Sequence, residues 1–389
     1  MNQILSSQLT DGVYVTKPTY LDEKFILISP EIAVSDELME RLSRWGFDHL
    51  LSDGEIVTEP PTISTAATVE SEDTPLAAID QGRRDSQEMR QAQAVYNELI
   101  EFVEKMFANF LSAMELPMNP VQTRVKTVLE QLRERKRYLL RLPDLDPGPA
   151  TNYIVDHAVK TTIVSVAVGM SMKLPPHKLL DIGTGAMLHE IGMIRLPSQL
   201  YMSDKELTER EKKAITTHPV LGFKILRQYN YPMHVCLSVL ECRENVDGTG
   251  YPRGITTEKI STYAKIISAA STFAAMASAR PYRKAIDGHT IMKTLLGGRD
   301  TRYDKDILMA AVATFSLFPY GTYVKLRSGH QAIVTDIKPD KPRVPHVRIL
   351  TDPNGAPLAE QPVVDTDSEQ HAVSGVLSHD EVARLNASL

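Results

Sequence analysis

The middle of the chain, from about residue 146 to residue 318, has a nearly all-helical pattern, and this feature constrains the fold most strongly. Proline, glycine or a capping serine, threonine or aspartate separates most of its segments. The expected helices cover residues 149–172, 176–190, 208–227, 233–243, 260–279, 287–297 and 304–317. A succession of this length predicts a mainly α-helical domain with its own core over residues 146–318.

Two further helices are expected before this block, over residues 89–145, because apolar side chains recur there at three- and four-residue steps. The two stripes consist of Ala92, Val95, Leu99, Val103, Met106, Phe110 and Met114, and of Val121, Val125, Val128, Leu132, Leu139 and Leu142. The basic run Arg133-Glu-Arg-Lys-Arg137 within the second stripe is interpreted as a solvated helix face. The stripes suit a helical hairpin or a dimerising coiled coil, so a protein partner or a homodimer is expected through residues 90–142.

The two ends of the chain differ from this helical centre. Residues 1–57 alternate short apolar runs with turns around a helical pattern that starts at Ser35, which predicts a small α/β module. Residues 58–88 are rich in Thr, Ser, Pro and acids, the composition of a disordered linker. Residues 319–389 alternate apolar and polar positions between turns and predict a β-rich C-terminal extension.

Composition places the chain among soluble globular proteins, with 389 residues, 42% hydrophobic and 24% charged. The formal net charge of −6 gives no reason to expect a nucleic-acid surface. Cys236 and Cys242 are too few for a disulfide framework, which favours the reducing cytoplasm. No run of about 18 apolar residues predicts a membrane span, and the N-terminus does not resemble a signal peptide.

Three histidines lie on or at the ends of the expected central helices: His157, His189 and His218. Asp156 and Glu190 stand beside the first two. Histidine together with carboxylate is suitable ligand chemistry for Zn, Mn or Fe. A lone histidine is nevertheless more often a packed or capping residue, so the spacing alone leaves both interpretations open.

Four blocks follow one another over residues 150–285: HEIGMIRLP, THPVLGFKIL, ECRENVDGTGYPRG and ARPYRKA. They resemble, in this order, the motifs HDIGKIGIP, RHPEIGAELL, HHERWDGSGYPRG and DRPYRKA of the HD-GYP family. That family belongs to the HD superfamily of metal phosphohydrolases and consists of bacterial phosphodiesterases that linearise and hydrolyse cyclic di-GMP. The resemblance implies an HD-type helical bundle with a metal site in its middle.

The resemblance also implies a metal centre that is only partly kept. His157, His189, Glu190 and His218 match family ligands, with Glu190 in place of an aspartate, and imply a residual site for one divalent Fe, Mn or Zn ion. Three other ligand positions are replaced, the two adjacent histidines by Cys242 and Arg243 and a late aspartate by Ser271. The family's lysine falls on Met193, and a carboxylate of some members falls on Tyr153.

A guanidinium is a permanent cation and cannot bind a metal ion. Arg243 is therefore expected to pair with Glu190 and to take the place of one ion, and a two-metal centre is not expected. The expected ligand-binding residues are Asp247, Gly248, Gly250, Tyr251, Pro252, Arg280 and Arg283. A merely structural turn and ordinary surface ion pairs remain alternatives for these residues.

Three functions follow from these residues. The first is a catalytically degenerate HD-GYP protein that acts as a sensor or an interaction module and binds a cyclic dinucleotide. The second is an active cyclic di-GMP phosphodiesterase with a reduced metal centre. The third is a scaffold in which the hairpin and the end domains have the main role.

Overall fold

The computed structural model describes two compact units, Met1–Thr74 and Pro75–Leu389. The described residues are 2–5, 9–10, 12–16, 19–20, 26–28, 34, 49–58, 75–148, 151–202, 208–278, 286–297 and 302–388. Side chains in the helix that starts at Pro75 are described from residue 85 onward.

The first unit contains two small antiparallel sheets. The larger has the strand order β1 (Asn2–Leu5), β5 (His49–Ser52), β3 (Thr19–Tyr20) and β4 (Ile26–Ile28), and in the other β2 (Tyr14–Val15) pairs with β6 (Ile56–Val57). Strands are thus present in the predicted N-terminal module. The helix expected from Ser35 lies outside the described residues.

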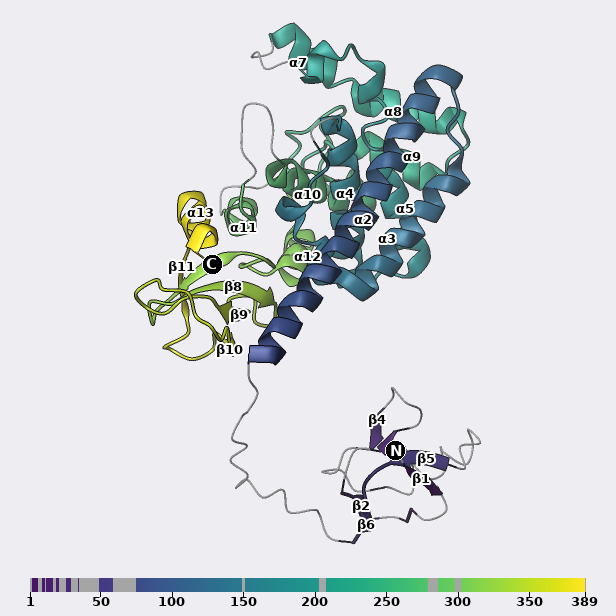
Figure 1. Cartoon of the computed structure of the whole chain (residues 1–389). Helices are drawn as coiled ribbons and strands as arrows, with labels where there is room; N and C mark the ends of the chain where they lie inside the picture. The colour runs from purple at the N-terminus through teal and green to yellow at the C-terminus, as the bar shows by residue number, and fades with distance from the viewer. Residues whose placement is uncertain are drawn as a thin grey trace. The chain divides into compact units, whose positions relative to one another are not determined.

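The second unit is a helical bundle followed by a small sheet, so the predicted mainly α-helical fold with a β-rich C-terminal extension is confirmed (Figure 1). Its helices are α2 (Pro75–Ala113), α3 (Met118–Leu139), α4 (Tyr153–Ser171), α5 (Pro176–Leu188), α6 (Gln199–Met202), α7 (Glu209–Ile215), α8 (His218–Gln228), α9 (Met233–Glu241), α10 (Thr262–Ala277), α11 (Gly288–Leu296), α12 (Lys305–Phe315) and α13 (His379–Ser388). The 3₁₀ turns are η2 (Leu142–Asp144), η3 (Met193–Arg195) and η4 (Thr257–Lys259).

Helix α4 forms the centre of the bundle, since every residue from Ile154 to Gly169 is buried. It packs against α5, α10 and α12 and against the α2–α3 hairpin. Its sequence is apolar or small around nearly the whole circumference, the pattern of a helix that neighbours enclose on all sides. The polar residues on α4, including His157, are therefore held inside the core.

The predicted hairpin is present as α2 and α3, but both of its apolar stripes pack into the bundle core. The stripes therefore serve the fold of this domain, and a dimerising coiled coil is not needed to explain them. Helix α2 also begins at Pro75, so residues 75–88 are helical although their composition predicted a linker to residue 88. Proline suits the first turn of a helix, and the following alanines and glutamine favour helix formation. Residues 59–74 of the expected linker lie outside the described part.

The helix expected over residues 208–227 is split into α7 and α8 at Thr216 and Thr217. The cause is Pro219, which has no N–H to donate to the carbonyl of Ile215 and so cannot continue the same helix. Proline is tolerated in a first turn, and α8 begins one residue before it, at His218. The break thus sets the position of a candidate site histidine.

The C-terminal sheet is antiparallel, with the order β10 (Val363–Asp365), β9 (His346–Ile349), β8 (Gln331–Asp336), β7 (Tyr323–Leu326) and β11 (Val373–Val376). Alternate residues such as Val324, Val334 and Val347 point into its own small core. None of the helices in the described part of the chain has the length and apolar character needed to cross a bilayer.

We predict that Gly192→Ala lowers the stability of the bundle. A Cβ atom on Gly192 would lie 2.0 Å from the carbonyl oxygen of His218 and 2.6 Å from the nitrogen of Gly222, both backbone atoms that cannot rotate away. The expected loss is about 1–3 kcal/mol in the free energy of unfolding, the usual cost of overpacking. Denaturant unfolding followed by circular dichroism measures it. Gly375→Ala, where a Cβ atom meets nothing within 4 Å, is the matched control.

Candidate functional site

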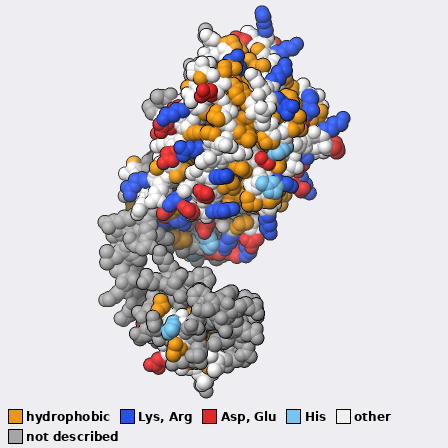
Figure 2. All heavy atoms as spheres, turned by 90° about the vertical axis from the view of Figure 1, so that its right-hand side faces the viewer, with side chains coloured by type: hydrophobic (Ala, Val, Ile, Leu, Met, Phe, Trp, Pro, Cys, Tyr) orange, Lys and Arg blue, Asp and Glu red, His pale blue; other side chains and the backbone are white. Residues whose placement is uncertain are grey.

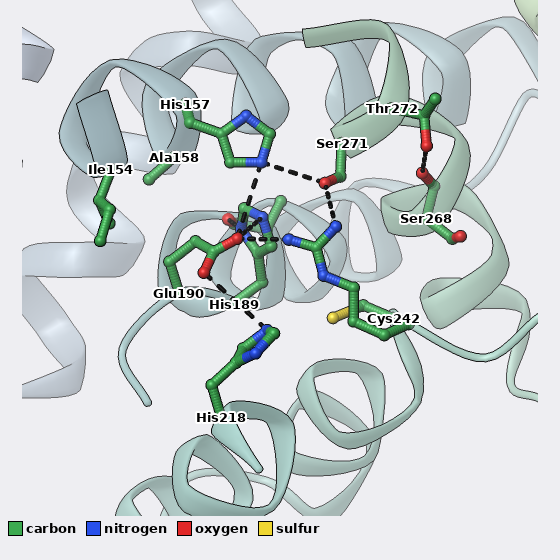
Figure 3. A network of polar contacts seen from close by, with 12 residues as sticks. Ile154, His157, Ala158, His189, Glu190, His218, Cys242, Ser268, Ser271 and Thr272 are labelled. Atoms are coloured by element: carbon green, nitrogen blue, oxygen red, sulfur yellow. Dashed lines mark hydrogen bonds and ion pairs between the residues drawn. The ribbon is translucent and has the colours of Figure 1, made fainter. Parts of the chain in front are cut away.

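Helix ends bring the candidate residues together around one carboxylate. His189 caps the C-terminus of α5 and is followed by Glu190, while His218 opens α8. The residues that meet in the interior of the bundle are His157 from α4, His189 and Glu190 after α5, His218 from α8, Arg243 after α9 and Ser271 from α10 (Figure 3). All of them are buried except Arg243, whose side chain is 25% exposed.

Two of the histidine rings are oriented by backbone carbonyls that the helices leave free. His189 Nδ1 lies 2.7 Å from the carbonyl oxygen of Ala186, and His218 Nδ1 lies 2.7 Å from that of Ile215. The carbonyl of Ile215 is the one that Pro219 leaves without a helical partner. Because a carbonyl only accepts, each Nδ1 bears a proton, and in the neutral form of the ring Nε2 presents a lone pair.

These lone pairs converge on Glu190. His189 Nε2 is 3.3 Å from Glu190 Oε1, and His218 Nε2 is 3.9 Å from Glu190 Oε2. Neither Nε2 atom nor Glu190 Oε2 has a hydrogen-bond partner among the described residues. Burial holds the pKa of His218 down, at about 4, so its ring is neutral near neutral pH. The centre therefore collects acceptors that a cation or a donor would satisfy.

Arg243 supplies that cation from within the chain, as predicted. Its Nη2 donates to Glu190 Oε1, and its Nη1 donates to Ser271 Oγ at 3.1 Å. Burial by itself would raise the pKa of Glu190, but the adjacent guanidinium outweighs it and holds the pKa well below the ordinary value. Burial likewise opposes the charge on Arg243, and Glu190 overcomes it and raises the pKa of Arg243. The two groups thus form a buried ion pair.

Ser271 links this ion pair to His157. Its Oγ accepts from Arg243 and lies 3.1 Å from His157 Nε2. A serine hydroxyl can donate one hydrogen bond and accept two, so the direction of the contact with His157 follows the tautomer of the ring. In either direction, the nitrogen of His157 that would face a metal ion is in contact with Ser271.

The Cys242 thiol takes no part in this centre. It donates to the carbonyl oxygen of Val239 at 3.3 Å, and burial raises its pKa to about 12. A thiol with such a pKa remains protonated near neutral pH, whereas a metal ligand must be a thiolate. The Cys242 thiol is therefore engaged by the backbone of α9.

One group of side chains in the described part of the chain has the spacing of a metal site. The ligand atoms of His157, His189 and Glu190 all lie within 4.8 Å of one another, which fits a single divalent ion. His218, which was predicted with them, faces the other oxygen of the same carboxylate, with its Nε2 3.9 Å from Glu190 Oε2. The oxygen nearest to His157 and His189 is Glu190 Oε1, the same oxygen that Arg243 contacts. A metal ion and the guanidinium would therefore compete for one oxygen.

Like charges strengthen this competition. Two unit charges about 4 Å apart repel by about 4 kcal/mol at the effective dielectric constant of partly buried sites, and a divalent ion doubles this. The donor set thus fits one metal ion only if Arg243 moves away. It does not fit two ions, because Ser271 and Arg243 offer no anionic ligand at their positions.

The loop that follows Arg243 is a tightly braced turn. Asp247 Oδ1 accepts from the backbone N–H of Thr249 at 3.0 Å, and Gly248 has a φ of 81°, which favours glycine. A Cβ atom on Gly250 would lie 2.2 Å from the nitrogen of Asn245, so glycine is required there too. The N–H of Tyr251 donates to the carbonyl oxygen of Arg243 at 3.0 Å. The turn is therefore folded back on the residue that fills the centre.

Two buried carboxylates that the sequence analysis missed hold this loop. Glu244 accepts from the backbone N–H groups of Arg253 at 2.7 Å and of Ile255 at 3.2 Å. Glu241 accepts from the N–H of Ser261 at 2.8 Å and from the Arg253 side chain. The signal in the sequence was the pair of acids that flanks Cys242 and Arg243. Both act as structural acceptors for the loop.

Some of the remaining predicted residues lie beside the centre, and others are outside the described part of the chain. Tyr251 approaches the ring of His218 edge-on, with centroids 6.2 Å apart, and precedes Pro252 in the loop. Tyr153 stacks on His157 at 5.6 Å, and Met193 is buried. Arg280 and Arg283 lie outside the described residues.

Comparison with known proteins confirms the family resemblance. Residues 150–307 match the model of the HD domain family, so the chain contains an HD domain. The cyclic di-GMP phosphodiesterase PdeB of Borreliella burgdorferi is 33% identical over 204 residues, which cover 52% of this chain and 54% of that protein. A cyclic di-GMP phosphodiesterase of Pseudomonas aeruginosa is 26% identical over 214 residues, 55% of this chain and 51% of that protein.

The chain therefore spans about half the length of these curated relatives. Among solved structures, the HDG"Y"P protein Bd1817 from Bdellovibrio bacteriovorus aligns with 80% of this chain and 97% of that chain. The TM-score of that alignment is 0.45 and the sequence identity 13%.

We predict that Arg243→Met destabilises the protein by about 3 kcal/mol, because it leaves Glu190 as a buried charge without its cation. The double variant Arg243→Met/Glu190→Gln should recover most of that loss, since it removes both charges together. Denaturant unfolding of the two single variants and the double variant measures the coupling. If the double variant loses as much free energy of unfolding as the two single variants together, a direct ion pair is contradicted.

We also predict that acid weakens the metal-free protein through His218. The folded-state pKa of His218 is about 4, below the value of about 6.5 in the unfolded chain, so only the unfolded state takes up the proton between these values. The contribution of neutral His218 to the free energy of unfolding is fully present above about pH 6.5. It decreases by about 2 kcal/mol as the pH falls to about 5. Unfolding measured at several pH values should show a shallower slope for His218→Gln than for the unchanged chain.

Proposed function

We propose that this chain is a cyclic dinucleotide signalling protein of the HD-GYP type that has lost hydrolysis at an ordinary enzymatic rate. The observation that supports this is the contact of Arg243 with both Glu190 and Ser271. A guanidinium between these two residues occupies the carboxylate that a metal ion would need. The protein then acts as a sensor or an interaction module in the cytoplasm.

The proposed ligand is cyclic di-GMP, because the two curated relatives are named as phosphodiesterases of that nucleotide. The turn from Asp247 to Pro252 is the proposed contact for the ligand, together with Arg280 and Arg283 as partners of its phosphates. Glycines in the turn allow a ligand to approach the backbone closely.

The charges at the centre explain why binding and hydrolysis separate. Metal ions in such sites polarise the phosphate and provide a hydroxide nucleophile when bound. In this chain the charges of Glu190 and Arg243 cancel each other, and His218, whose pKa is about 4, adds no positive charge near neutral pH. A phosphodiester would therefore meet a neutral centre with one cation already paired. That centre offers little stabilisation to a more negative transition state.

A phosphodiesterase with a single metal ion is the second candidate. The spacing of His157, His189 and Glu190 within 4.8 Å favours it. In that case Glu190 would leave Arg243 and join the two histidines around the ion, and Arg243 would turn toward the phosphate. A scaffold without any nucleotide ligand is the third possibility, and the binding experiment below distinguishes it.

Metal content and hydrolysis measured on one sample test the proposal. The purified full chain, incubated with Mn²⁺ or Fe²⁺ and then desalted, should retain far less than one ion per chain. It should also leave cyclic di-GMP intact. The variant Glu190→Asp/Cys242→His/Arg243→His/Ser271→Asp, which restores the family's ligands, should retain metal and serves as the comparison.

Stoichiometric metal together with turnover in the unchanged chain would overturn the proposal in favour of the second candidate, and His189→Ala should then abolish turnover. Isothermal titration with cyclic di-GMP should show binding to the unchanged chain. The absence of any binding heat, confirmed by equilibrium dialysis, would favour the scaffold.

A further inference from the structure

The seam between α2 and α3 changes from apolar to charged at its open end. From Ala92 to Phe110 on α2, and from Val121 to Leu132 on α3, the facing positions are apolar and buried. One and two steps further out on α2 the same stripe continues with Glu88 and Asp85. The next stripe position on α3 is Arg135, within the basic run that was interpreted as a solvated face.

Asp85 joins three elements through its carboxylate. It accepts from Tyr138 Oη at 2.7 Å and from Arg137 Nη2 at 2.8 Å, both on α3. It also accepts from Arg348 Nη2 on β9 at 2.6 Å, so the C-terminal sheet is attached to α2 at this point. Figure 1 shows the start of α2 running beside that sheet.

Arg135 provides the second connection. Its Nε lies 3.0 Å from Glu88 and donates to Gln91 Oε1 at 2.9 Å, both on α2. Its backbone leaves the helical region, with φ −127° and ψ 34°, so α3 is kinked where it contacts α2. The basic run is thus partly an interhelical contact, which corrects the interpretation as a solvated face. We call Asp85, Glu88, Arg135, Arg137 and Arg348 the ionic clamp.

The ionic clamp stabilises the contact between α2 and α3 less than the buried apolar part of the seam does. Its side chains are partly exposed, from 16% for Arg348 to 41% for Arg137. Ion pairs at such exposure stabilise little and are screened by salt. Among the described side chains of α2, the fully buried ones begin at Ala92. Met89 packs partly against the bundle core, and the other contacts named for residues 85–91 are polar. This part of α2 therefore has few apolar contacts and frays more easily than the rest of the helix.

Further along α2, Tyr96 contacts Asp156, the residue that precedes His157. Tyr96 follows Asp85 by eleven residues, or three turns, so it lies on the same face of α2. Its hydroxyl donates to the buried Asp156, which precedes His157 on α4. Asp156 also pairs with Lys160 at 3.2 Å and accepts from Ser278 Oγ at 2.7 Å at the end of α10. A shift of α2 would thus act on both helices that hold His157 and Ser271.

We propose that residues 85–91 of α2 are a releasable segment whose release is transmitted to the candidate site. Release of the clamp loosens the Tyr96–Asp156 contact and with it the start of α4. This inference goes beyond the proposed function and is independent of whether the site hydrolyses a nucleotide.

Hydrogen exchange of the full chain tests this coupling. Asp85→Asn/Glu88→Gln removes both carboxylates of the clamp with little change in volume. Amides of residues 85–91 should then exchange about ten-fold faster, and those at the start of α4, residues 153–160, should also lose protection. The matched control is Glu98→Gln/Glu101→Gln, which makes the same charge change on the exposed face of α2, where Glu98 and Glu101 pair with Arg124 and Lys105. It should leave both regions unchanged.

Two further measurements distinguish release of the ionic clamp from its effect on the start of α4. Raising NaCl from about 0.05 M to about 0.5 M should reproduce the effect of the clamp variant on the unchanged chain. Tyr96→Phe should reduce protection of residues 153–160 while residues 85–91 stay protected. Equal exchange in the clamp variant and its control would overturn the proposal. Faster exchange of residues 85–91 with no change at residues 153–160 would overturn the coupling.

Discussion

The buried ion pair between Arg243 and Glu190 determines the character of the centre of this domain. A carboxylate enclosed by three histidines in the bundle interior needs a positive partner, because an unpaired charge is costly to bury. Arg243 meets that need from within the chain. Ser271 and His157 are arranged around the same guanidinium. The loop from Asp247 to Pro252 is fixed to the backbone of Arg243.

A cation that belongs to the chain differs from a metal ion in ways that bear on function. It cannot be removed by a chelator, it does not activate water, and its charge does not change near neutral pH. The orientation of His189 and His218 still reflects a site for ions, since backbone carbonyls hold both lone pairs inward. The centre thus combines inward-facing histidines with a charge that comes from a side chain.

Much of the fold could be predicted because local patterns decide it. The central helices lie close to their expected ranges, and the charge relation of Arg243 to Glu190 followed from residue type. Other features depend on contacts that local patterns do not contain. The Cys242 thiol turns to a backbone carbonyl, and Glu241 and Glu244 brace a loop from positions with no distinguishing spacing. The basic run that contains Arg135 and Arg137 was expected to face solvent. In the structure these two arginines pair with Glu88 and Asp85 on the neighbouring helix α2.

The sequence by itself determined the helical class, the order of the HD-type motifs and which side chains stand at the motif positions, because periodicity and residue chemistry are local properties. Tertiary structure alone decided which oxygen the guanidinium contacts and which nitrogen of His189 and His218 faces inward. Those outcomes depend on where helices end and cross, and the ends are set by packing among residues distant in the chain. Hydrogen bonds and ion pairs act over a few ångströms, so their partners were settled only when the bundle brought five segments to one point.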